Sequence, residues 1–299
     1  MSIRAWFLSA IMRRTIRKQF DSFEDAESFR KVLAESGSLT PQTPDHIAVE
    51  PVNIEGVDCE WIAGKDADFS RVLIYLHGGG YVIGGPDSHR DIAWRLSEAG
   101  AMRVLLVDYR LAPEHPFPAA VEDATTCYRH LIDHGYDPAR IAIAGDSAGG
   151  GLTIATMLHL KNLGMPLPNC AVVYSPWADL SNSGDSIVAN EKKDVMLTPA
   201  ALKKFATLYL GERDPKAPLA SPLFGDLTGL PPILIHASDS EILQSDSERL
   251  ARRLREAGGD VELKLWPKMP HVFPVFAARI PEGKVALEET GDFLRKRIH

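Results

Sequence analysis

The chain repeats one pattern: a short apolar run followed by a longer stretch with helical periodicity. The run at 72–76 (VLIYL) is typical, and similar runs follow at 104–107, 141–144, 171–174 and 233–235. An apolar run without alternation suits a strand that is buried on both faces. Helices are expected between and after these runs, at 88–99, 119–133, 149–163, 246–257 and 283–297. This order predicts an α/β fold with a mostly parallel sheet covered on both sides.

The remaining segments depart from that pattern. A hairpin is predicted around Glu55-Gly56, with strands at 47–54 and 57–62. Apolar and polar residues alternate at 261–265, which suits a strand near an edge of the sheet. Residues 1–45 look helical and end in a Pro-rich turn, and the polar stretch 181–218 interrupts the alternation before a helix at 200–210. We therefore expect an N-terminal helical cap segment at 1–45 and a catalytic domain at 46–299 that carries a cap insertion at about 181–218.

Charge and cysteine content exclude several classes of protein. The 33 basic and 40 acidic residues give a net charge of −7, so the chain lacks the basic surface expected of a nucleic-acid-binding protein. Its three cysteines, at 59, 127 and 170, are odd in number and form no C-x-x-C. A disulfide framework is therefore not expected. We expect the protein to be cytoplasmic, where thiols stay reduced.

The first eighteen residues, MSIRAWFLSAIMRRTIRK, need separate treatment. Their apolar part precedes the basic residues, which reverses the order of a signal peptide. No run reaches the roughly 20 apolar residues of a membrane span, so stable membrane insertion is not expected. The segment predicts an amphipathic helix on the protein's own surface, with a helix at a membrane surface as the alternative.

One turn carries the pattern G-x-S-x-G. The stretch GDSAG at 145–149 directly follows the run 141–144 and precedes a predicted helix. A serine on such a sharp turn has a strained backbone, so its neighbours must be glycines that leave space. Ser147 is therefore a candidate nucleophile at a helix N-terminus, where the helix dipole favours negative charge. The alternative is a glycine-rich helix start without chemistry.

A second turn, His77-Gly78-Gly79-Gly80, directly follows the run 72–76. Glycines leave backbone N–H groups unshielded, and such groups can stabilise a developing oxyanion. A phosphate loop is the alternative, but neither of its usual patterns is present. We expect His77 to organise this loop rather than to act as a base, because it stands beside the oxyanion donors.

A nucleophilic serine needs a base. Of the ten histidines, His271 stands in the loop after the last predicted strand, where this architecture delivers its histidine. His115 comes too early in the chain, and His236 lies in a predicted buried strand. His271 is therefore the predicted base.

The base needs an acid to orient it, and that acid should follow the run 233–235. Asp239 and Glu241 both fit by chemistry alone. Asp246 is expected to be a helix N-cap instead, with Arg249 in the next turn.

Together these motifs resemble the hormone-sensitive-lipase-like esterases, a bacterial branch of the α/β-hydrolases. The resemblance covers about residues 45–299 and rests on HGGG at 77–80, DYRLAPEHPFPAA at 108–120, GDSAGG at 145–150, SPW at 175–177 and PHVF at 270–273. It implies an α/β-hydrolase fold with an eight-stranded, mostly parallel sheet and a helical cap partly formed by the N-terminus. It also implies hydrolysis of short-chain carboxylic esters without a cofactor or a metal ion.

The resemblance also bears on the acid. Aligning Leu243 and Asp246 with the family pattern D-P-x-x-D-[DE] puts Glu241 at the acid position and Asp239 two residues too early. Glu241 departs from the usual Asp, but Glu is an accepted third member of the triad in this fold. The implied site consists of Ser147 as nucleophile, His271 as base, Glu241 as acid, and the N–H groups of Gly79, Gly80 and Ala148 as oxyanion hole.

The predicted function is thus a serine carboxylesterase that acts on small, short- to medium-chain acyl esters through an acyl-enzyme. An amide-directed or deacetylating hydrolase is the alternative, since it shares these motifs. A non-catalytic binder of small molecules would typically have lost the histidine. A homodimer through the last strand and the last helix is expected because it is common among relatives.

Two further expectations concern the surroundings of the site. We expect 108–110 and Glu114 to form a buried polar network that fixes the loop beside the oxyanion turn. Apolar residues of the two cap segments are candidates for the acyl pocket, or alternatively for ordinary packing between cap and core: Phe7, Phe20, Phe23, Met196, Leu197, Phe205 and Leu208.

Overall fold

The computed structural model describes residues 1–23, 25–35 and 41–298, and its centre is a sheet of eight strands. The strands lie in the order β1-β2-β4-β3-β5-β6-β7-β8. Only the pairs β1/β2 and β2/β4 are antiparallel, which confirms the predicted hairpin and the mostly parallel sheet. The strands are β1 (Ala48–Ile54), β2 (Val57–Ala63), β3 (Asp68–Leu76), β4 (Met102–Asp108), β5 (Ile141–Asp146), β6 (Cys170–Tyr174), β7 (Ile233–Ser238) and β8 (Val261–Trp266).

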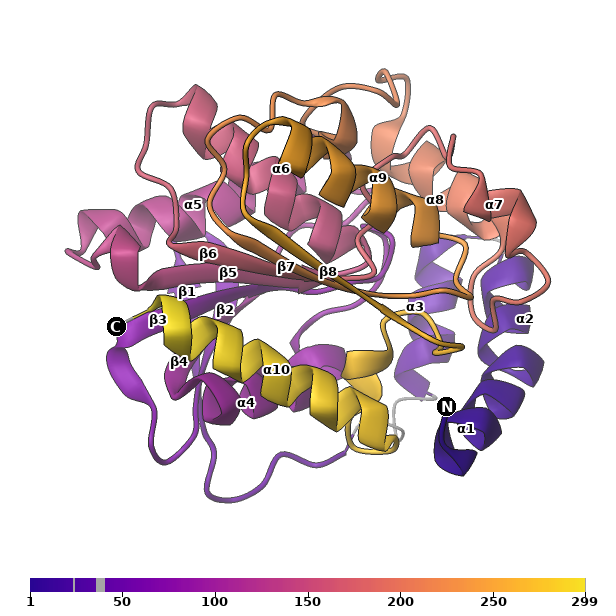
Figure 1. Ribbon diagram of the computed structural model, residues 1–299, viewed down its shortest axis with the longest axis horizontal. Helices are drawn as coiled ribbons and strands as arrows, with labels where there is room; N and C mark the ends of the chain where they lie inside the picture. The colour runs from indigo at the N-terminus through magenta and orange to yellow at the C-terminus, as the bar shows by residue number, and fades with distance from the viewer. Residues whose placement is uncertain (24, 36–40, 299) are drawn as a thin grey trace.

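Helices cover both faces of this sheet (Figure 1). One face carries α5 (Ala119–Asp133), α6 (Ala148–Asn162) and α9 (Gln244–Glu256), and the other carries α4 (Pro86–Gly100) and α10 (Pro281–Arg297). In β3, Val72, Ile74 and Leu76 belong to one buried cluster, while Leu73 and Tyr75 belong to the other. The fully buried apolar runs therefore arise because successive side chains of a central strand enter two cores.

The edge strand β8 differs from the central strands. Among the described residues it pairs only with β7, and each of its residues is half-buried or exposed rather than buried. This confirms the edge position expected from its alternating sequence. Short 3-10 helices in the described part of the chain include η2 (Pro138–Arg140), η3 (Pro222–Phe224) and η4 (Phe273–Phe276).

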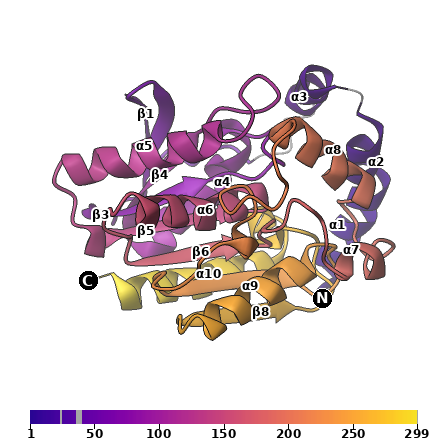
Figure 2. The same cartoon turned by 90° about the horizontal axis from the view of Figure 1, so that it is seen from above.

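The other helices gather beyond one end of the sheet (Figures 1 and 2). They are α1 (Ile3–Arg14), α2 (Ile16–Ser22), α3 (Ala26–Glu35), α7 (Ser186–Ala189) and α8 (Pro199–Leu210). Phe20 and Phe29 meet edge to face at 5.3 Å, and Phe23 stacks on Phe205 of α8 at 5.1 Å. Aromatic packing thus joins the N-terminal helices to the polar segment that interrupts the strand–helix alternation.

Helix α1 corrects the expectation of an amphipathic surface helix. It buries Ala5 and Met12 against the body of the protein, but Ile3, Trp6 and Phe7 are exposed. The helix thus lies on the surface of the protein, as expected. Its exposed side, however, carries large apolar side chains rather than mainly polar ones. Within the described ranges, no helix combines the length and apolarity needed to cross a bilayer.

The three cysteines are buried free thiols. The thiols of Cys59 and Cys127 share a hydrogen bond, with their sulfur atoms 3.6 Å apart, and form no disulfide. The structure thus contains no disulfide between the three, as the cysteine count predicts.

Candidate active site

Ser147 lies on the turn between β5 and α6. Its backbone has φ of 53° and ψ of −118°, a strained conformation for a residue with a side chain. A Cβ on Gly149 would approach the carbonyl oxygen of Leu76 to 2.0 Å, and one on Gly145 would approach that of Gly149 to 2.3 Å. The two glycines therefore let the turn close against β3, as the G-x-S-x-G pattern predicts.

The glycine turn after β3 lies directly beside this serine turn. Gly78 donates its N–H to the carboxylate of Asp146 at 3.1 Å, and that carboxylate also accepts from the Tyr75 hydroxyl at 2.8 Å. Gly80 has φ of 63°, and a Cβ there would lie 2.7 Å from the Phe205 ring. Neither the backbone nor the space at this position suits another residue.

Ser147, His271 and Glu241 form one hydrogen-bonded chain. Nε2 of His271 lies 2.8 Å from the Ser147 hydroxyl, and Nδ1 lies 2.5 Å from Oε2 of Glu241. The second oxygen of Glu241 accepts the N–H of Ser238 at 2.7 Å. Both the imidazole and the carboxylate are buried. The geometry is that of a nucleophile, a base and an orienting acid in series.

Glu241, not Asp239, is thus the carboxylate that meets the imidazole. Asp239 is exposed and accepts the backbone N–H of Lys268 at 2.7 Å. The turn after β7 directs one side chain outward and the next but one inward, which side-chain chemistry alone left open and which agrees with the alignment to the family pattern. A hydroxyl pair, Ser238 and Ser240, donates to the carbonyl of Met269 and so fastens this turn to the loop of His271.

Charge and burial oppose each other at the imidazole. Burial alone would lower the pKa of His271, but the hydrogen bond and charge of Glu241, with the charges of Asp194 and Asp146, raise this pKa above its usual value. A base that is more basic than a free histidine takes a proton from a hydroxyl more readily.

His77 and His236 take structural positions. Burial lowers the pKa of His77 to about 3, so its ring is neutral, and it stacks on Tyr109 at 4.1 Å while its carbonyl accepts the Tyr109 hydroxyl. His236 is buried in β7 and accepts from the Trp266 indole, and His115 is exposed. His77 thus lies where a loop organiser would, as expected.

Comparisons with known proteins identify the family of the chain. A family model described as the alpha/beta hydrolase fold matches residues 73–275. The chain belongs to the α/β-hydrolase family. This hydrolase is 44% identical to an acetyl-hydrolase of Streptomyces hygroscopicus over 82% of its own length and 81% of that protein. It is 34% identical to an esterase of Acinetobacter venetianus over 96% of its length and 95% of that protein.

Solved structures add the branch of the family. An esterase of the bacterial hormone-sensitive lipase family superposes with a TM-score of 0.95 at 42% identity, covering 100% of the hydrolase and 99% of that chain. The resemblance predicted from the motifs is therefore confirmed. So are the α/β-hydrolase fold and the class of carboxylic ester hydrolase.

The predicted polar network around 108–110 and Glu114 is mostly wrong. Tyr109 is buried and holds the glycine turn, but Asp108, Arg110 and Glu114 are exposed. Arg110 pairs with Asp123 of α5. Glu114 pairs with an arginine of α3, Arg30, whose guanidinium also donates to two loop carbonyls. The charged groups of these long side chains remain in contact with water, which avoids the free-energy cost of desolvating them in a buried network.

Asp246 is not the N-cap of α9. The helix begins at Gln244, and Asp246 in its first turn is fully buried. One of its oxygens accepts the N–H groups of both Ala178 and Asp179 at 2.9 Å. Arg249 pairs with Asp179 instead, at 2.8 Å. The carboxylate is drawn inward because two backbone donors of the loop after β6 need a partner.

Sequence reasoning also missed Asp194, which is buried beside the acid. One oxygen accepts the N–H of Ile242 at 2.9 Å, and the other accepts those of Met196 and Leu197. Its sequence signal is an Asp placed directly before a short apolar run, which is typical of a turn.

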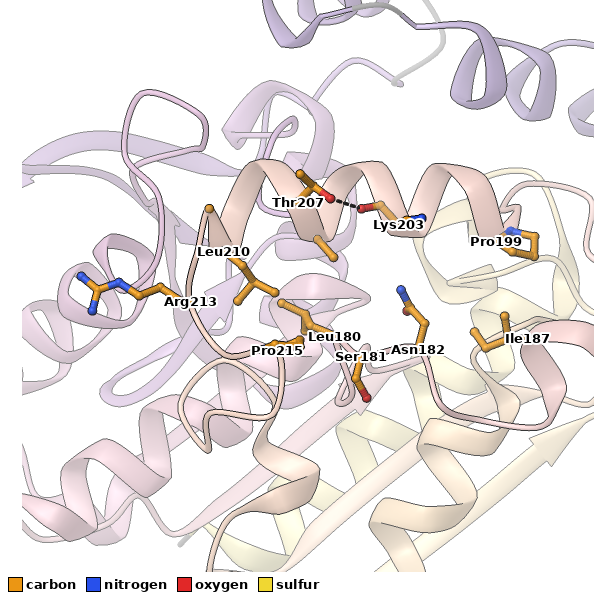
Figure 3. A pocket seen from close by; sticks show the side chains of 12 residues that line it. Leu180, Ser181, Asn182, Ile187, Pro199, Lys203, Thr207, Leu210, Arg213 and Pro215 are labelled. Atoms are coloured by element: carbon orange, nitrogen blue, oxygen red, sulfur yellow. Dashed lines mark hydrogen bonds between the residues drawn. The ribbon is translucent and has the colours of Figure 1, made fainter.

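A cavity of about 450 Å³ lies between α8 and the segment after β6 (Figure 3). Leu180 and Asn182 lie on one side of it, opposite Lys203 and Leu210 of α8. None of the seven predicted acyl-pocket residues lines this cavity, and neither do the three residues of the hydrogen-bonded chain. The proposed pocket aromatics pack against one another instead, and Phe7 is 61% exposed.

Within the described part of the chain, no group of three or more His, Cys, Asp or Glu side chains is arranged to hold a metal ion.

Proposed function

We propose that this hydrolase is a serine carboxylesterase that cleaves short- to medium-chain acyl esters of small molecules. The observation that carries the proposal is the chain from the Ser147 hydroxyl through His271 to Glu241, with separations of 2.8 and 2.5 Å. A buried carboxylate, an imidazole and a hydroxyl in this order activate the hydroxyl as a nucleophile.

In the first half of the reaction the Ser147 oxygen attacks the ester carbonyl carbon while His271 takes the hydroxyl proton. The carbonyl oxygen becomes an oxyanion, and the N–H groups of Gly79, Gly80 and Ala148 stabilise it. His271 then delivers its proton to the leaving alcohol as the C–O bond breaks. Glu241 holds the imidazole in the required tautomer and stabilises the imidazolium.

In the second half water replaces the alcohol. His271 takes a proton from water, whose oxygen attacks the acyl carbon. The second tetrahedral intermediate collapses, the proton returns to the Ser147 oxygen, and the carboxylic acid leaves. Ala148 supports the oxyanion role because it is the first residue of α6, where an N–H has no carbonyl partner within the helix.

The preference for short acyl groups rests on the cap. We assign residues 1–45 and about 181–218 to it, because Phe20 and Phe23 pack on Phe205, whose ring closes over Gly80. Aromatic rings packed this closely above the glycine turn limit the room for a long acyl chain.

The test is hydrolysis of p-nitrophenyl acetate, butyrate, octanoate and palmitate by the wild type and by Ser147→Ala. Turnover should be fastest on the shorter esters and should vanish in Ser147→Ala while its thermal midpoint stays near that of the wild type. A folded wild type that hydrolyses none of the four esters would overturn the proposal.

A second candidate is a hydrolase that removes acetyl groups, including those on amides. It is favoured by two similar proteins, the acetyl-hydrolase of Streptomyces hygroscopicus and a putative acetyl-hydrolase of Mycobacterium tuberculosis, 31% identical over the whole chain. A panel of acetyl and formyl amides beside acetyl esters separates the two candidates, since the chemistry is shared and only the pocket differs.

Two further parts of the proposal concern the protein as a whole. A homodimer would form through β8 and α10, since β8 leaves one strand edge unpaired. Light scattering tests the homodimer, and a molar mass equal to that of a monomer would refute it. The proposed cytoplasmic location rests on the three free thiols.

A further inference from the structure

The outer face of α1 is apolar and uncovered. Ile3, Trp6, Phe7 and Ile11 form it, with exposed fractions of 87%, 59%, 61% and 44%. With Met1, they make up five of the ten large apolar side chains that are exposed among the residues the structure describes. Apolar side chains gathered on one helix, rather than scattered, mark an interaction surface.

Basic residues border this face. At about 100° per residue along a helix, Arg4 and Arg13 fall on its opposite sides and Arg14 falls within it near the C-terminal end. Residues 1–20 contain five basic and no acidic residues, whereas the rest of the chain contains 28 basic and 40 acidic residues. Residues 1–20 thus carry a net charge of +5 on an otherwise acidic protein, and three of these five basic residues lie on α1, the helix with the apolar face.

Contacts on the opposite side of α1 hold the helix in a fixed orientation on the protein. The opposite side of α1 buries Ala5 and Met12. Arg13 donates to the carbonyls of Lys192 and Lys193 at 2.8 and 2.9 Å. Because α1 is fixed through its other side, the outer face stays directed away from the protein, and the helix lies at the edge of the molecule in Figure 1.

We propose that α1 is an in-plane anchor that binds the surface of an anionic lipid bilayer. A helix with exposed Trp and Phe on one face and arginines at its borders suits the boundary between headgroups and acyl chains. The arginines attract anionic headgroups while the apolar face enters the acyl region. A second copy of the chain fits less well, because a two-fold contact would bring the same arginines against each other.

The anchor lies close to the proposed active site. Helix α1 leads directly into α2, whose Phe20 packs on Phe205, the ring above Gly80. A bilayer that holds α1 therefore lies beside the cap, and esters dissolved in the bilayer reach the cap without first entering water. This last step rests on the proposed esterase activity, whereas binding to the bilayer does not.

The first experiment measures co-sedimentation of the full chain with phosphatidylcholine vesicles, with and without phosphatidylglycerol. The wild type should bind only the anionic vesicles, and binding should weaken as salt is added. Arg4→Glu with Arg14→Glu should weaken binding at least about 25-fold, since each basic residue contributes about fivefold at an anionic surface and the two new carboxylates are repelled by it. Ile3→Ser with Trp6→Ser should weaken it at least about tenfold through the lost apolar contact.

Matched controls change the same kinds of residue elsewhere. Leu163→Ser removes an apolar side chain that is 54% exposed at the end of α6, and Lys65→Glu with Arg252→Glu reverses two exposed charges. Both controls should bind like the wild type. All variants should hydrolyse p-nitrophenyl butyrate in the absence of vesicles at the wild-type rate, which shows that they are folded and separates this test from that of the esterase activity.

A second readout locates the helix in the bilayer. Lipids brominated on the acyl chains should quench the emission of Trp6, and Trp6→Phe should bind while losing that quenching. The proposal is overturned if the wild type ignores anionic vesicles or if the α1 variants bind as well as the controls. It is also overturned if light scattering shows a dimer that Ile3→Ser with Trp6→Ser converts to a monomer, since the face would then join two copies.

Discussion

Replacing Glu241 with Gln isolates the role of the carboxylate with a minimal change in shape. Glu241 accepts two N–H groups, that of Ser238 at 2.7 Å and Nδ1–H of His271 at 2.5 Å. Gln offers one acceptor oxygen and one NH₂ group, so it can accept from only one of these two donors. The site is fully buried, and water cannot replace the missing acceptor.

The backbone donor decides which arrangement forms. If the Gln oxygen faces His271, the NH₂ group meets the N–H of Ser238, and two buried donors facing each other cost about 1–3 kcal/mol. If the oxygen faces Ser238, the NH₂ group donates to Nδ1 of His271 and every group is satisfied. The imidazole proton then sits on Nε2, which faces the Ser147 hydroxyl at 2.8 Å. An imidazole in that tautomer cannot take the serine proton.

The expected loss is therefore large and falls on kcat. In a serine protease triad the same carboxylate-to-amide change lowers turnover about 10⁴-fold. At about 1.36 kcal/mol for each factor of ten, this corresponds to about 5.4 kcal/mol of transition-state stabilisation. With p-nitrophenyl butyrate we expect Glu241→Gln to lower kcat about 10³- to 10⁴-fold with KM changed less than about threefold.

Asp239→Asn is the matched control, since it makes the same chemical change two residues away. Its side chain keeps an oxygen to accept the Lys268 N–H, so kcat should stay within about threefold of the wild type. Thermal midpoints check that both variants fold. The reasoning is refuted if Glu241→Gln stays within about tenfold of the wild type or if Asp239→Asn loses as much.

Three further predictions follow from the site and its surroundings. First, kcat/KM should rise with pH through a pKa above the 6.5 of an ordinary histidine, because the base must be neutral and carboxylates raise the pKa of His271; an acid limb below 6.5 would contradict this. Second, Gly80→Ala should lower kcat/KM about 100-fold, since its Cβ would lie 2.7 Å from the Phe205 ring, and adding Phe205→Leu should restore part of the loss; no difference between the two variants would exclude the clash. Third, burial and the charge of Asp179 raise the pKa of Asp246 to about 8, against about 3.9 in an unfolded chain, so the folded state binds the proton more tightly and stability falls as pH rises between these values. Urea unfolding at about pH 5 and about pH 8 measures this decrease in the free energy of unfolding, which should be smaller in Asp246→Asn than in the wild type. An equal decrease in both proteins would refute the assignment.

The sequence predicts those parts of the fold whose structure is determined by residues close together in the chain. A run such as 72–76 is apolar throughout because its side chains enter two cores, so its place inside the sheet follows from five residues. The glycines around Ser147 are required by a backbone approach of 2.0 Å, which any such turn against a neighbouring strand imposes. Local chemistry is enough in both cases.

The errors arise where the partner of a side chain is distant in the chain. Asp246 looks like an N-cap because it stands near a helix start, but the donors that it serves lie 67 and 68 residues earlier. The acid is not such an error: side-chain chemistry alone leaves Asp239 and Glu241 open, because the choice depends on one turn after β7, but the alignment with the family pattern already favours Glu241. Contacts that close only in three dimensions leave no periodic signal.

The N-terminal helices are part of the site's framework rather than an appendage. Arg17 of α2 donates to the carbonyls of Glu191 and Asp194. Asp194 in turn accepts the N–H of Ile242, the residue next to Glu241. Hydrogen bonds on the two sides of Asp194 therefore link α2 to Ile242, the residue that follows the acid that orients the imidazole. The arginines of this segment divide accordingly: Arg17 points inward to backbone carbonyls and is half-buried, whereas the positive charge on α1 lies at the surface. Because different side chains serve the two purposes, a bilayer can engage the outer face of α1 without withdrawing any donor that supports Glu241.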